Sequence, residues 1–243
     1  MQESRTFARI RWQGAHRATV VVGLPFGAAR RLTAAIRRCD KKDMIEINSI
    51  CVFCGSANGR NPAYVAAAER LGADMAAHGI RLVYGGGNVG LMGATARAVM
   101  AAGGKVTGII PEFLVSRERM LDGVDELHVV PDMHTRKRMM FEAADAFVTL
   151  PGGIGTLEEV VEQLTWAQLG QHKKPIVLAD IDGFWQPLVG LINHMNREAF
   201  IREGFDIRYH VARSAADILP TVLAAAGSNG EVVAGDAETI ARM

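Results

Sequence analysis

Several features that mark specialised proteins are scarce in this sequence. Only three of its 243 residues are cysteines, too few for the disulfide framework of a small secreted domain. No uninterrupted apolar run reaches the roughly 18–20 residues of a membrane-spanning helix, and no glycine loop leads into the Gly-Lys-Ser/Thr of a P-loop. The 49% hydrophobic and 22% charged residues exclude a disordered or collagen-like chain and support a sizeable core.

Net charge is also small, although the charges are unevenly distributed. The formal net charge is +1, but residues 1–43 carry ten lysines and arginines against three acidic residues, a balance of +7. Residues 44–243 therefore carry −6. A mildly acidic body lacks the basic face that nucleic-acid binding needs, so neither a nucleic acid nor a membrane is expected as a partner. The low cysteine content favours a reducing, cytoplasmic location.

Residues 1–43 differ from the remainder and are interpreted as an N-terminal extension outside the core. An apolar stretch at residues 18–29 resembles a signal peptide, but glycine and proline residues interrupt it, and two arginines follow in place of a small-residue cleavage site. The working start of the core is Met44. A targeting segment and an additional structural element remain the alternatives for this region.

From residue 44 onward, apolar runs alternate with amphipathic segments. Continuous apolar strands separated by helices form a parallel sheet covered on both faces, so residues 44–243 are predicted to form one doubly wound α/β domain. Its ligand site is expected outside the carboxyl ends of the strands. The expected strands lie near residues 47–54, 80–84, 105–110, 145–150 and 175–179, with an amphipathic candidate at 124–130, and the helices at 62–78, 91–102, 135–144, 156–170, 184–199 and 215–226.

Two of the cysteines, Cys51 and Cys54, have the Cys-x-x-Cys spacing of redox and zinc motifs. They lie within an expected strand, where residues three apart point to opposite faces with Cα atoms about 10 Å apart. That separation exceeds the roughly 7 Å limit for a disulfide, and no second cysteine pair completes a zinc site. Both are predicted to be small core residues, and no metal is expected.

Three loops that follow predicted strands are rich in glycine: residues 55–56, 85–93 and 151–155. Each runs from a strand through a glycine turn into a helix, so backbone N–H groups and the helix dipole would face a bound anion, most commonly phosphate. The second loop also matches the dinucleotide fingerprint Gly-x-Gly-x-x-Gly, with Glu112 further along. An NAD-dependent oxidoreductase is therefore an alternative, although a single match has little specificity.

The third loop continues into Thr156 and a pair of glutamates that ends at Glu159. Thr156 can cap the helix and offer a hydroxyl to phosphate, while a carboxylate near a sugar stabilises an oxocarbenium-like centre or activates water. The alternative for Glu159 is a capping box with Thr156. In residues 132–139, Arg136 and Lys137 supply positive charge to a phosphate or orient the catalytic carboxylate. A solvated basic helix start is the alternative there.

Taken together, the motifs resemble those of the LONELY GUY family, cytokinin riboside 5′-monophosphate phosphoribohydrolases that are often mislabelled lysine decarboxylases. The similarity covers residues 47–226 and rests on residues 85–93, on the Met-His-x-Arg-Lys sequence that starts at Met133, and on the Pro-Gly-Gly-x-Gly-Thr-x-x-Glu signature that ends at Glu159. It implies a Rossmann-like fold and hydrolysis of the N-glycosidic bond of a purine nucleoside monophosphate to free base and ribose 5-phosphate, without a metal or other cofactor. AMP is expected to be a further substrate, and a homodimer is expected.

The resemblance assigns residue roles by position. Arg136 and Glu159 match the family's catalytic arginine and glutamate. Thr135 stands where many members have glutamate, a departure that is expected to be tolerated. The candidate substrate contacts are Gly55, Ser56, Gly86, Gly87, Glu118, Met133, Lys137, Gly152, Gly153, Ile154, Gly155, Thr156, Leu157, Glu158 and Thr165.

Two further functions remain open. A decarboxylase would hold pyridoxal phosphate on a Schiff-base lysine, but the candidate lysines lie in basic runs or at strand starts, namely Lys105, Lys137, Lys173 and Lys174. The second open function is that of a non-catalytic nucleotide or molybdenum-cofactor carrier, because related Rossmann-like proteins bind that cofactor at similar glycine loops. The pair formed by Arg136 and Glu159 separates the carrier from the hydrolase, since a carrier has no chemical need for it.

Deleting residues 1–43, so that the chain starts at Met44, is expected to leave fold and activity intact, because every motif lies beyond the deletion. The measurements are a thermal melt and a base-release assay on both lengths of chain. An insoluble or inactive truncated chain would show that the extension contributes to the folded structure.

Overall fold

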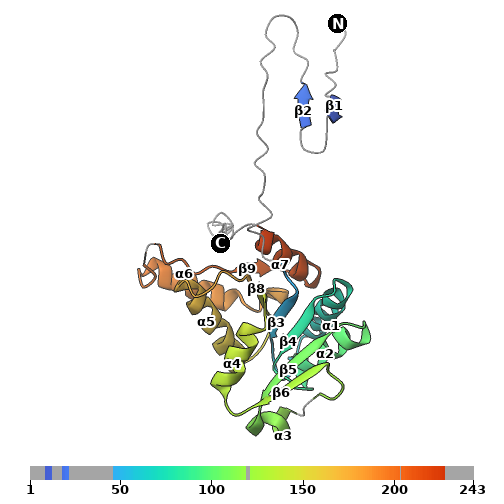
Figure 1. Ribbon diagram of the computed structural model, residues 1–243. Coiled ribbons are helices and arrows are strands. Elements are labelled where there is room, and N and C mark those ends of the chain that lie inside the picture. The colour runs from blue at the N-terminus through green and yellow to red at the C-terminus, as the bar shows by residue number, and fades with distance from the viewer. Residues whose placement is uncertain (1–8, 13–17, 22–45, 119–120, 203, 228–243) are drawn as a thin grey trace, which may run out of the picture. The chain divides into compact units, whose positions relative to one another are not determined.

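The computed structural model describes residues 9–12, 18–21, 46–118, 121–202 and 204–227 (Figure 1). The chain divides into two compact units, Met1–Lys41 and Lys42–Met243. In the first unit, β1 (Arg9–Trp12) and β2 (Ala18–Val21) pair antiparallel, which the periodicity of the sequence does not predict. Most of the N-terminal extension lies outside the described residues, so the prediction that it does not belong to the core stays a prediction.

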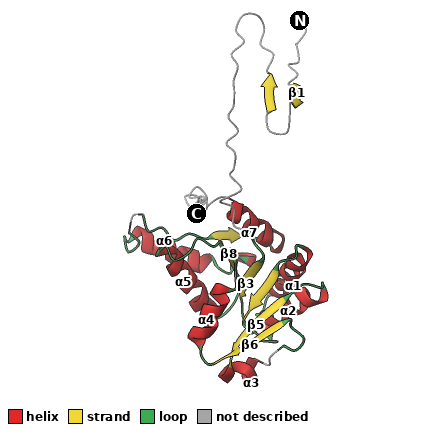
Figure 2. Ribbon diagram, in the orientation of Figure 1, coloured by secondary structure: helices red, strands yellow, loops and turns green. Residues whose placement is uncertain are grey.

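The second unit is built on one sheet of seven parallel strands in the order β6-β5-β4-β3-β7-β8-β9 (Figure 2). The chain enters at the middle strand, moves outward to β6, and then returns to place β7 on the other side of β3. The predicted Rossmann-like, doubly wound fold is confirmed. The strands are β3 (Ser49–Phe53), β4 (Arg81–Tyr84), β5 (Val106–Pro111), β6 (Glu126–Val130), β7 (Ala146–Thr149), β8 (Ile176–Ala179) and β9 (His210–Ala212).

Helices cover both faces of this sheet, because successive strand residues point to opposite sides. In β3, Ile50 and Val52 join the core under α1 (Pro62–Ala77), α2 (Gly90–Ala101) and α7 (Ile218–Gly227). Cys51 and Phe53 join the core under α4 (Met133–Glu142), α5 (Ile154–Gln168) and α6 (Gln186–Arg197). Within the described residues, no helix combines the length and the apolar character that crossing a membrane requires.

Cys51 in β3 and Cys54, the residue after this strand, confirm the predicted alternation of side chains. Cys51 belongs to one core and Cys54 to the other, as expected for residues on opposite faces of a strand. Burial, and secondarily the charge of Glu159, raises the pKa of the Cys51 thiol. The prediction that both are core residues is therefore confirmed.

Some elements differ from the predicted ones. The three-residue β9 and the four-residue α3 (Val115–Glu118) were not predicted, because neither is long enough to show a period. The helix α5 begins at Ile154, two residues before the predicted start, and α4 begins at Met133 in place of residue 135. Single 3-10 turns lie at Glu112–Leu114, Ile181–Gly183 and Ala215–Asp217.

Two backbone hydrogen bonds join the loops where the chain reverses direction across the sheet. The Gly55 N–H donates to the Pro151 carbonyl at 3.0 Å, which ties the loop after β3 to the loop after β7. The Leu91 N–H donates to the Gly55 carbonyl at 3.0 Å, which ties the start of α2 to the same point. Ligands of open α/β sheets bind at this reversal point, outside the carboxyl ends of the strands.

Candidate active site

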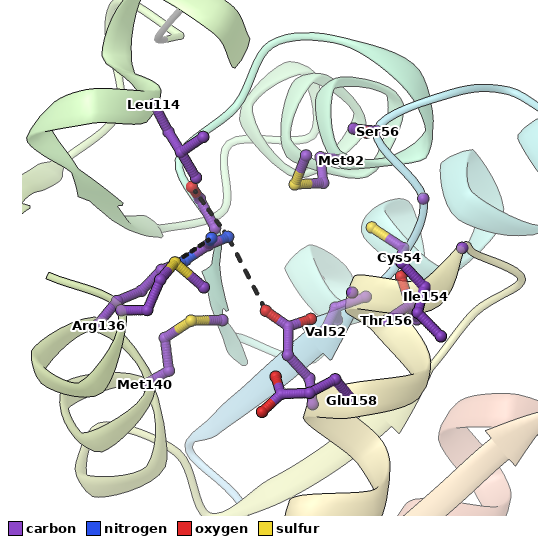
Figure 3. Close-up of a pocket in the computed structure, with 16 residues that line it drawn as sticks. Val52, Cys54, Ser56, Met92, Leu114, Arg136, Met140, Ile154, Thr156 and Glu158 are labelled. Atoms are coloured by element: carbon purple, nitrogen blue, oxygen red, sulfur yellow. Dashed lines mark hydrogen bonds and ion pairs between the residues drawn. The ribbon is translucent and has the colours of Figure 1, made fainter.

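A cavity of about 410 Å³ opens at this reversal point, within the size range of small-molecule sites (Figure 3). Its walls come from the ends of β3 and β4, from the residues after β5, from the first turn of α2, and from α4 and the first two turns of α5. Apolar and sulfur-containing side chains face charged ones across it. The lining residues are Val52, Cys54, Gly55, Ser56, Gly85, Met92, Leu114, Met133, Arg136, Met140, Gly153, Ile154, Gly155, Thr156, Glu158 and Glu159.

Arg136 reaches the cavity from the first turn of α4. The Asp132 carboxylate caps this helix by accepting the Thr135 N–H at 2.8 Å, and this hydrogen bond lowers the pKa of Asp132. The Thr135 hydroxyl donates to the same carboxylate at 3.1 Å, so the residue that departs from the family pattern supports the cap. The helix thus starts where it can aim Arg136 inward.

The Arg136 side chain is buried and held by long contacts. Its Nη2 lies 3.5 Å from the Gly85 carbonyl oxygen, and its Nη1 lies 3.8 Å from the Met133 sulfur. Among the described residues, its Nε has no hydrogen-bond partner. A buried guanidinium with donors left over favours a polar or anionic ligand, because an unpaired buried donor is costly.

Glu159 faces Arg136 from the second turn of α5, with its Oε1 3.9 Å from Nη2. The dashed line from Arg136 to a carboxylate in Figure 3 marks this ion pair. Both side chains are nearly buried, with exposed fractions of 6% for Arg136 and 11% for Glu159. The capping-box alternative for Glu159 is wrong, because Gly153 is the N-cap of α5 and no side chain caps this helix. Thr156 already lies inside the first turn, so Glu159 is directed into the cavity by the helix and not by a cap.

The N-terminus of α5 forms the opposite wall. Residues 153–156 line the cavity, and the first-turn N–H groups of a helix have no intrahelical acceptor. These groups and the helix dipole make an anion site. A Cβ atom at Gly152 would overlap the Thr156 side chain, so only glycine allows the loop to turn this closely onto the helix.

The second glycine loop, residues 85–93, reaches the cavity wall through Gly85 and Met92, whereas Gly86 and Gly87 do not line it. Gly86 has a positive φ of 80°, and a Cβ atom there would lie 2.9 Å from the Ile110 Cβ, so this glycine allows close packing against β5. The Leu91 N–H at the start of α2 is paired with the Gly55 carbonyl. Anion binding by this loop stays a prediction.

Lys137 follows Arg136 in α4 but does not line the cavity. Its Nζ donates to Glu158 at 2.5 Å and contacts Glu162 at 2.9 Å, which joins α4 to α5. Burial alone would lower the pKa of Lys137, but the hydrogen bonds that it donates to both carboxylates raise the pKa overall. The lysine therefore neutralises the carboxylate that neighbours Glu159, and the acidic pair can lie next to an anion site.

The structure brings together ten of the seventeen predicted site residues on the cavity wall. These are Gly55, Ser56, Met133, Arg136, Gly153, Ile154, Gly155, Thr156, Glu158 and Glu159. Six of the other predicted residues do not line it: Gly86, Gly87, Lys137, Gly152, Leu157 and Thr165. The side chain of the seventh, Glu118, lies outside the described part of the structure, so its substrate contact stays a prediction. Sequence reasoning did not assign Val52, Cys54, Gly85, Met92, Leu114 and Met140 to the site. Of these, Gly85 and Met92 belong to the second glycine loop and Cys54 to the Cys-x-x-Cys sequence, whereas the other three are apolar or sulfur-containing side chains at positions that no motif specifies.

Known proteins with similar sequences bear on this geometry. The family described as "Possible lysine decarboxylase" matches residues 92–222, more than half of the chain. The cytokinin riboside 5′-monophosphate phosphoribohydrolase LOG of Oryza sativa subsp. japonica is 51% identical over 154 residues, which are 63% of this chain and 64% of that protein. The probable cytokinin riboside 5′-monophosphate phosphoribohydrolase LOG6 of Arabidopsis thaliana is 47% identical over 165 residues, 68% and 82% of the two chains. The chain belongs to the LONELY GUY family.

This LONELY GUY chain spans 64% of the length of the rice protein. Among solved structures, the molybdenum cofactor binding protein of the phototrophic bacterium Rippkaea orientalis has a TM-score of 0.55 at 23% identity, covering 74% of this chain and 98% of that one. The Moco carrier protein of Chlamydomonas reinhardtii has a TM-score of 0.55 at 24% identity and covers the same shares. These structures show that the fold is shared.

Among the described residues, no group of three or more histidine, cysteine, aspartate or glutamate side chains is arranged to hold a metal ion. The polar groups on the wall are instead an arginine, two glutamates, a serine, a threonine and the first turn of a helix. Such a set suits an anionic, hydroxyl-bearing ligand.

Proposed function

We propose that this protein hydrolyses the N-glycosidic bond of purine riboside 5′-monophosphates, both cytokinin riboside monophosphates and AMP, to free base and ribose 5-phosphate. The observation that carries the proposal is the buried pair of Arg136 and Glu159, 3.9 Å apart, on the wall of a cavity that also receives the N-terminus of α5. The names of the similar rice and Arabidopsis proteins support the same reaction.

The 5′-phosphate is assigned to the first turn of α5. Backbone N–H groups of residues 154–156 and the helix dipole bind the dianion, and the buried Thr156 hydroxyl lies in the same turn. The phosphate thereby anchors the ribose, and binding energy at this remote group positions the reacting bond.

The ribose C1′ is assigned to the space between the first turn of α5, which binds the phosphate, and the Glu159 carboxylate. As the bond to the base breaks, positive charge develops on the sugar, and the Glu159 carboxylate stabilises that charge or activates the attacking water. The water supplies a hydroxyl to C1′ and a proton to the departing base. Arg136 orients the carboxylate and offers its remaining donors to the substrate.

The decarboxylase alternative does not fit the cavity. Pyridoxal phosphate chemistry needs a lysine at the reacting centre, and none of the described residues on the wall is a lysine. Lys137 forms ion pairs with two glutamates. The Lys174 Nζ donates to the Phe141 carbonyl at 2.6 Å and lies 4.0 Å from the centre of the Phe141 ring. Both amines are engaged elsewhere.

We also propose that two copies pair through an exposed face of α5. Val161 in this helix is 42% exposed, Leu169 at its C-cap is 60% exposed, and Ile154 at its start, which also lines the cavity, is 82% exposed. Their spacing places the three side chains along one side of the helix. Thr165, an expected substrate contact that does not line this chain's cavity, is exposed among them. A second copy would explain both the apolar face and the position of Thr165, and we place this dimer in the cytoplasm.

Purified protein is expected to release free base from AMP and from isopentenyl-AMP. The kcat/KM for adenosine is expected to be lower by a factor of at least about 10², because adenosine lacks the 5′-phosphate that the first turn of α5 binds. Chromatography of the released base measures all three rates. Equal turnover of adenosine and AMP would contradict the phosphate assignment, and tight AMP binding without any base release would favour the carrier.

Glu159→Gln is expected to lower kcat for AMP on the order of 10³-fold or more, because the amide keeps the shape of the side chain but not its charge. Arg136→Ala should also lower kcat, by about 10²-fold or more. The matched control is Arg138→Ala, since Arg138 is 78% exposed and pairs only with Glu142 among the described residues. A thermal melt of each variant accompanies the assay, and near-normal kcat in Glu159→Gln would contradict the catalytic assignment.

Leu169→Glu is expected to convert the dimer to a monomer, because the charge would be buried between the two copies. Light scattering coupled to size exclusion gives the mass of each variant. The control is Ala66→Glu, which places the same charge on an exposed position of α1. A wild-type monomer, or a dimer that survives the α5 substitution, would contradict this interface.

A further inference from the structure

The end of β4 and the side chain of Arg136 occupy adjoining space in a way that only glycine permits. Gly85 follows the last residue of β4 directly. A Cβ atom at this position would overlap the Arg136 Nη2 and lie 3.2 Å from both the Arg136 Cζ and the Met92 sulfur. The guanidinium therefore fills the volume in which any other residue would carry its side chain.

Strong hydrogen bonds do not account for the position of this guanidinium. Its contacts with the Gly85 carbonyl, the Met133 sulfur and Glu159 are 3.5, 3.8 and 3.9 Å long. Each is at or beyond the upper end of ordinary hydrogen-bond lengths. The guanidinium instead occupies the space that a Cβ atom at residue 85 would need, so the shape of the surface at Gly85 limits where it can lie.

We propose that Gly85 is a positioning residue that acts through Arg136, and this rests on the hydrolase function proposed above. Its lack of a side chain lets the guanidinium lie flat against the backbone at the end of β4, facing Glu159 across the cavity. The sequence pattern alone does not suggest this role, since the glycine belongs to a loop that resembles a phosphate-binding turn.

Gly90, in the same loop, shows how a glycine needed for backbone packing differs from one that positions a side chain. Gly90 has a positive φ of 61°, and a Cβ there would overlap the backbone of residues 56 and 57, which cannot move without disturbing the loop after β3. At Gly85 the main obstacle is the far end of a flexible side chain, which can swing away. Alanine at 85 should therefore spare the fold and displace Arg136, whereas alanine at 90 should destabilise the fold.

Gly85→Ala is expected to lower kcat for AMP by about 10²-fold while KM changes less than about threefold, because a displacement of about 1 Å at a catalytic group has that effect on rate. The control for the glycine-to-alanine change itself is Gly190→Ala, which points into open space on α6 and should keep wild-type kcat. In thermal melts, the Tm of Gly85→Ala should be near that of the wild type, whereas the Tm of Gly90→Ala should be lower.

A double variant tests whether the effect passes through Arg136. Lysine at position 136 carries a smaller head group that leaves room for a methyl group at 85. Adding Gly85→Ala to Arg136→Lys should therefore lower kcat less than about threefold beyond Arg136→Lys alone. A full 10²-fold loss in that background would overturn the proposal, as would a Gly85→Ala variant with wild-type kcat.

A crystal structure of Gly85→Ala gives a readout that does not depend on activity. The guanidinium is expected to leave the Gly85 carbonyl, and an unmoved Arg136 would overturn the inference. If wild-type protein releases no base from AMP, the hydrolase function fails on that measurement alone, while the position of Arg136 in the variant still decides the role of Gly85.

Discussion

The hydrogen bond from the Gly55 N–H to the Pro151 carbonyl, 3.0 Å long, joins the two halves of the sheet at its carboxyl edge. Strands on either side of this point lead to helices on opposite faces, so the loops diverge and leave a cavity between them. The first turn of α5 and the residues after β3 share its wall because this bond holds their loops together.

The charges around the cavity are arranged by helix geometry. Successive residues on a helix differ in direction by about 100°, so neighbours in sequence meet different partners. Arg136 faces Glu159 across the cavity, while Lys137 pairs with Glu158 and Glu162. Because the lysine neutralises these two carboxylates, the Glu159 carboxylate can act on a developing positive charge beside an anion site without excess negative potential.

The shared fold does not separate a hydrolase from a cofactor carrier. The Moco carrier structures match 74% of this chain at 23–24% identity, which shows the common architecture. The catalytic interpretation depends instead on a specific site: two buried, oppositely charged side chains that converge on a cavity beside a helix N-terminus. Function therefore has to be argued from these side chains and tested on them.

The sequence by itself determined the fold class and placed part of the cavity wall. Apolar strands alternate with amphipathic helices from residue 47 onward, and strand periodicity correctly placed Cys51 and Cys54 on opposite faces. The motifs also identified Arg136 and Glu159, because a glycine turn into a helix, a glutamate and a basic helix start have recognisable local patterns. Periods and motifs are local in sequence, so no tertiary information was needed for them.

Tertiary structure alone decided how these parts meet. It showed that Lys137 pairs with glutamates of α5, that α5 starts too early for Thr156 to cap it, and that Gly85 makes room for a guanidinium 51 residues away in sequence. The apolar wall of Val52, Met92, Leu114 and Met140 comes from four separate elements. Such contacts depend on the distance between side chains in the packed protein, which no spacing along the chain encodes.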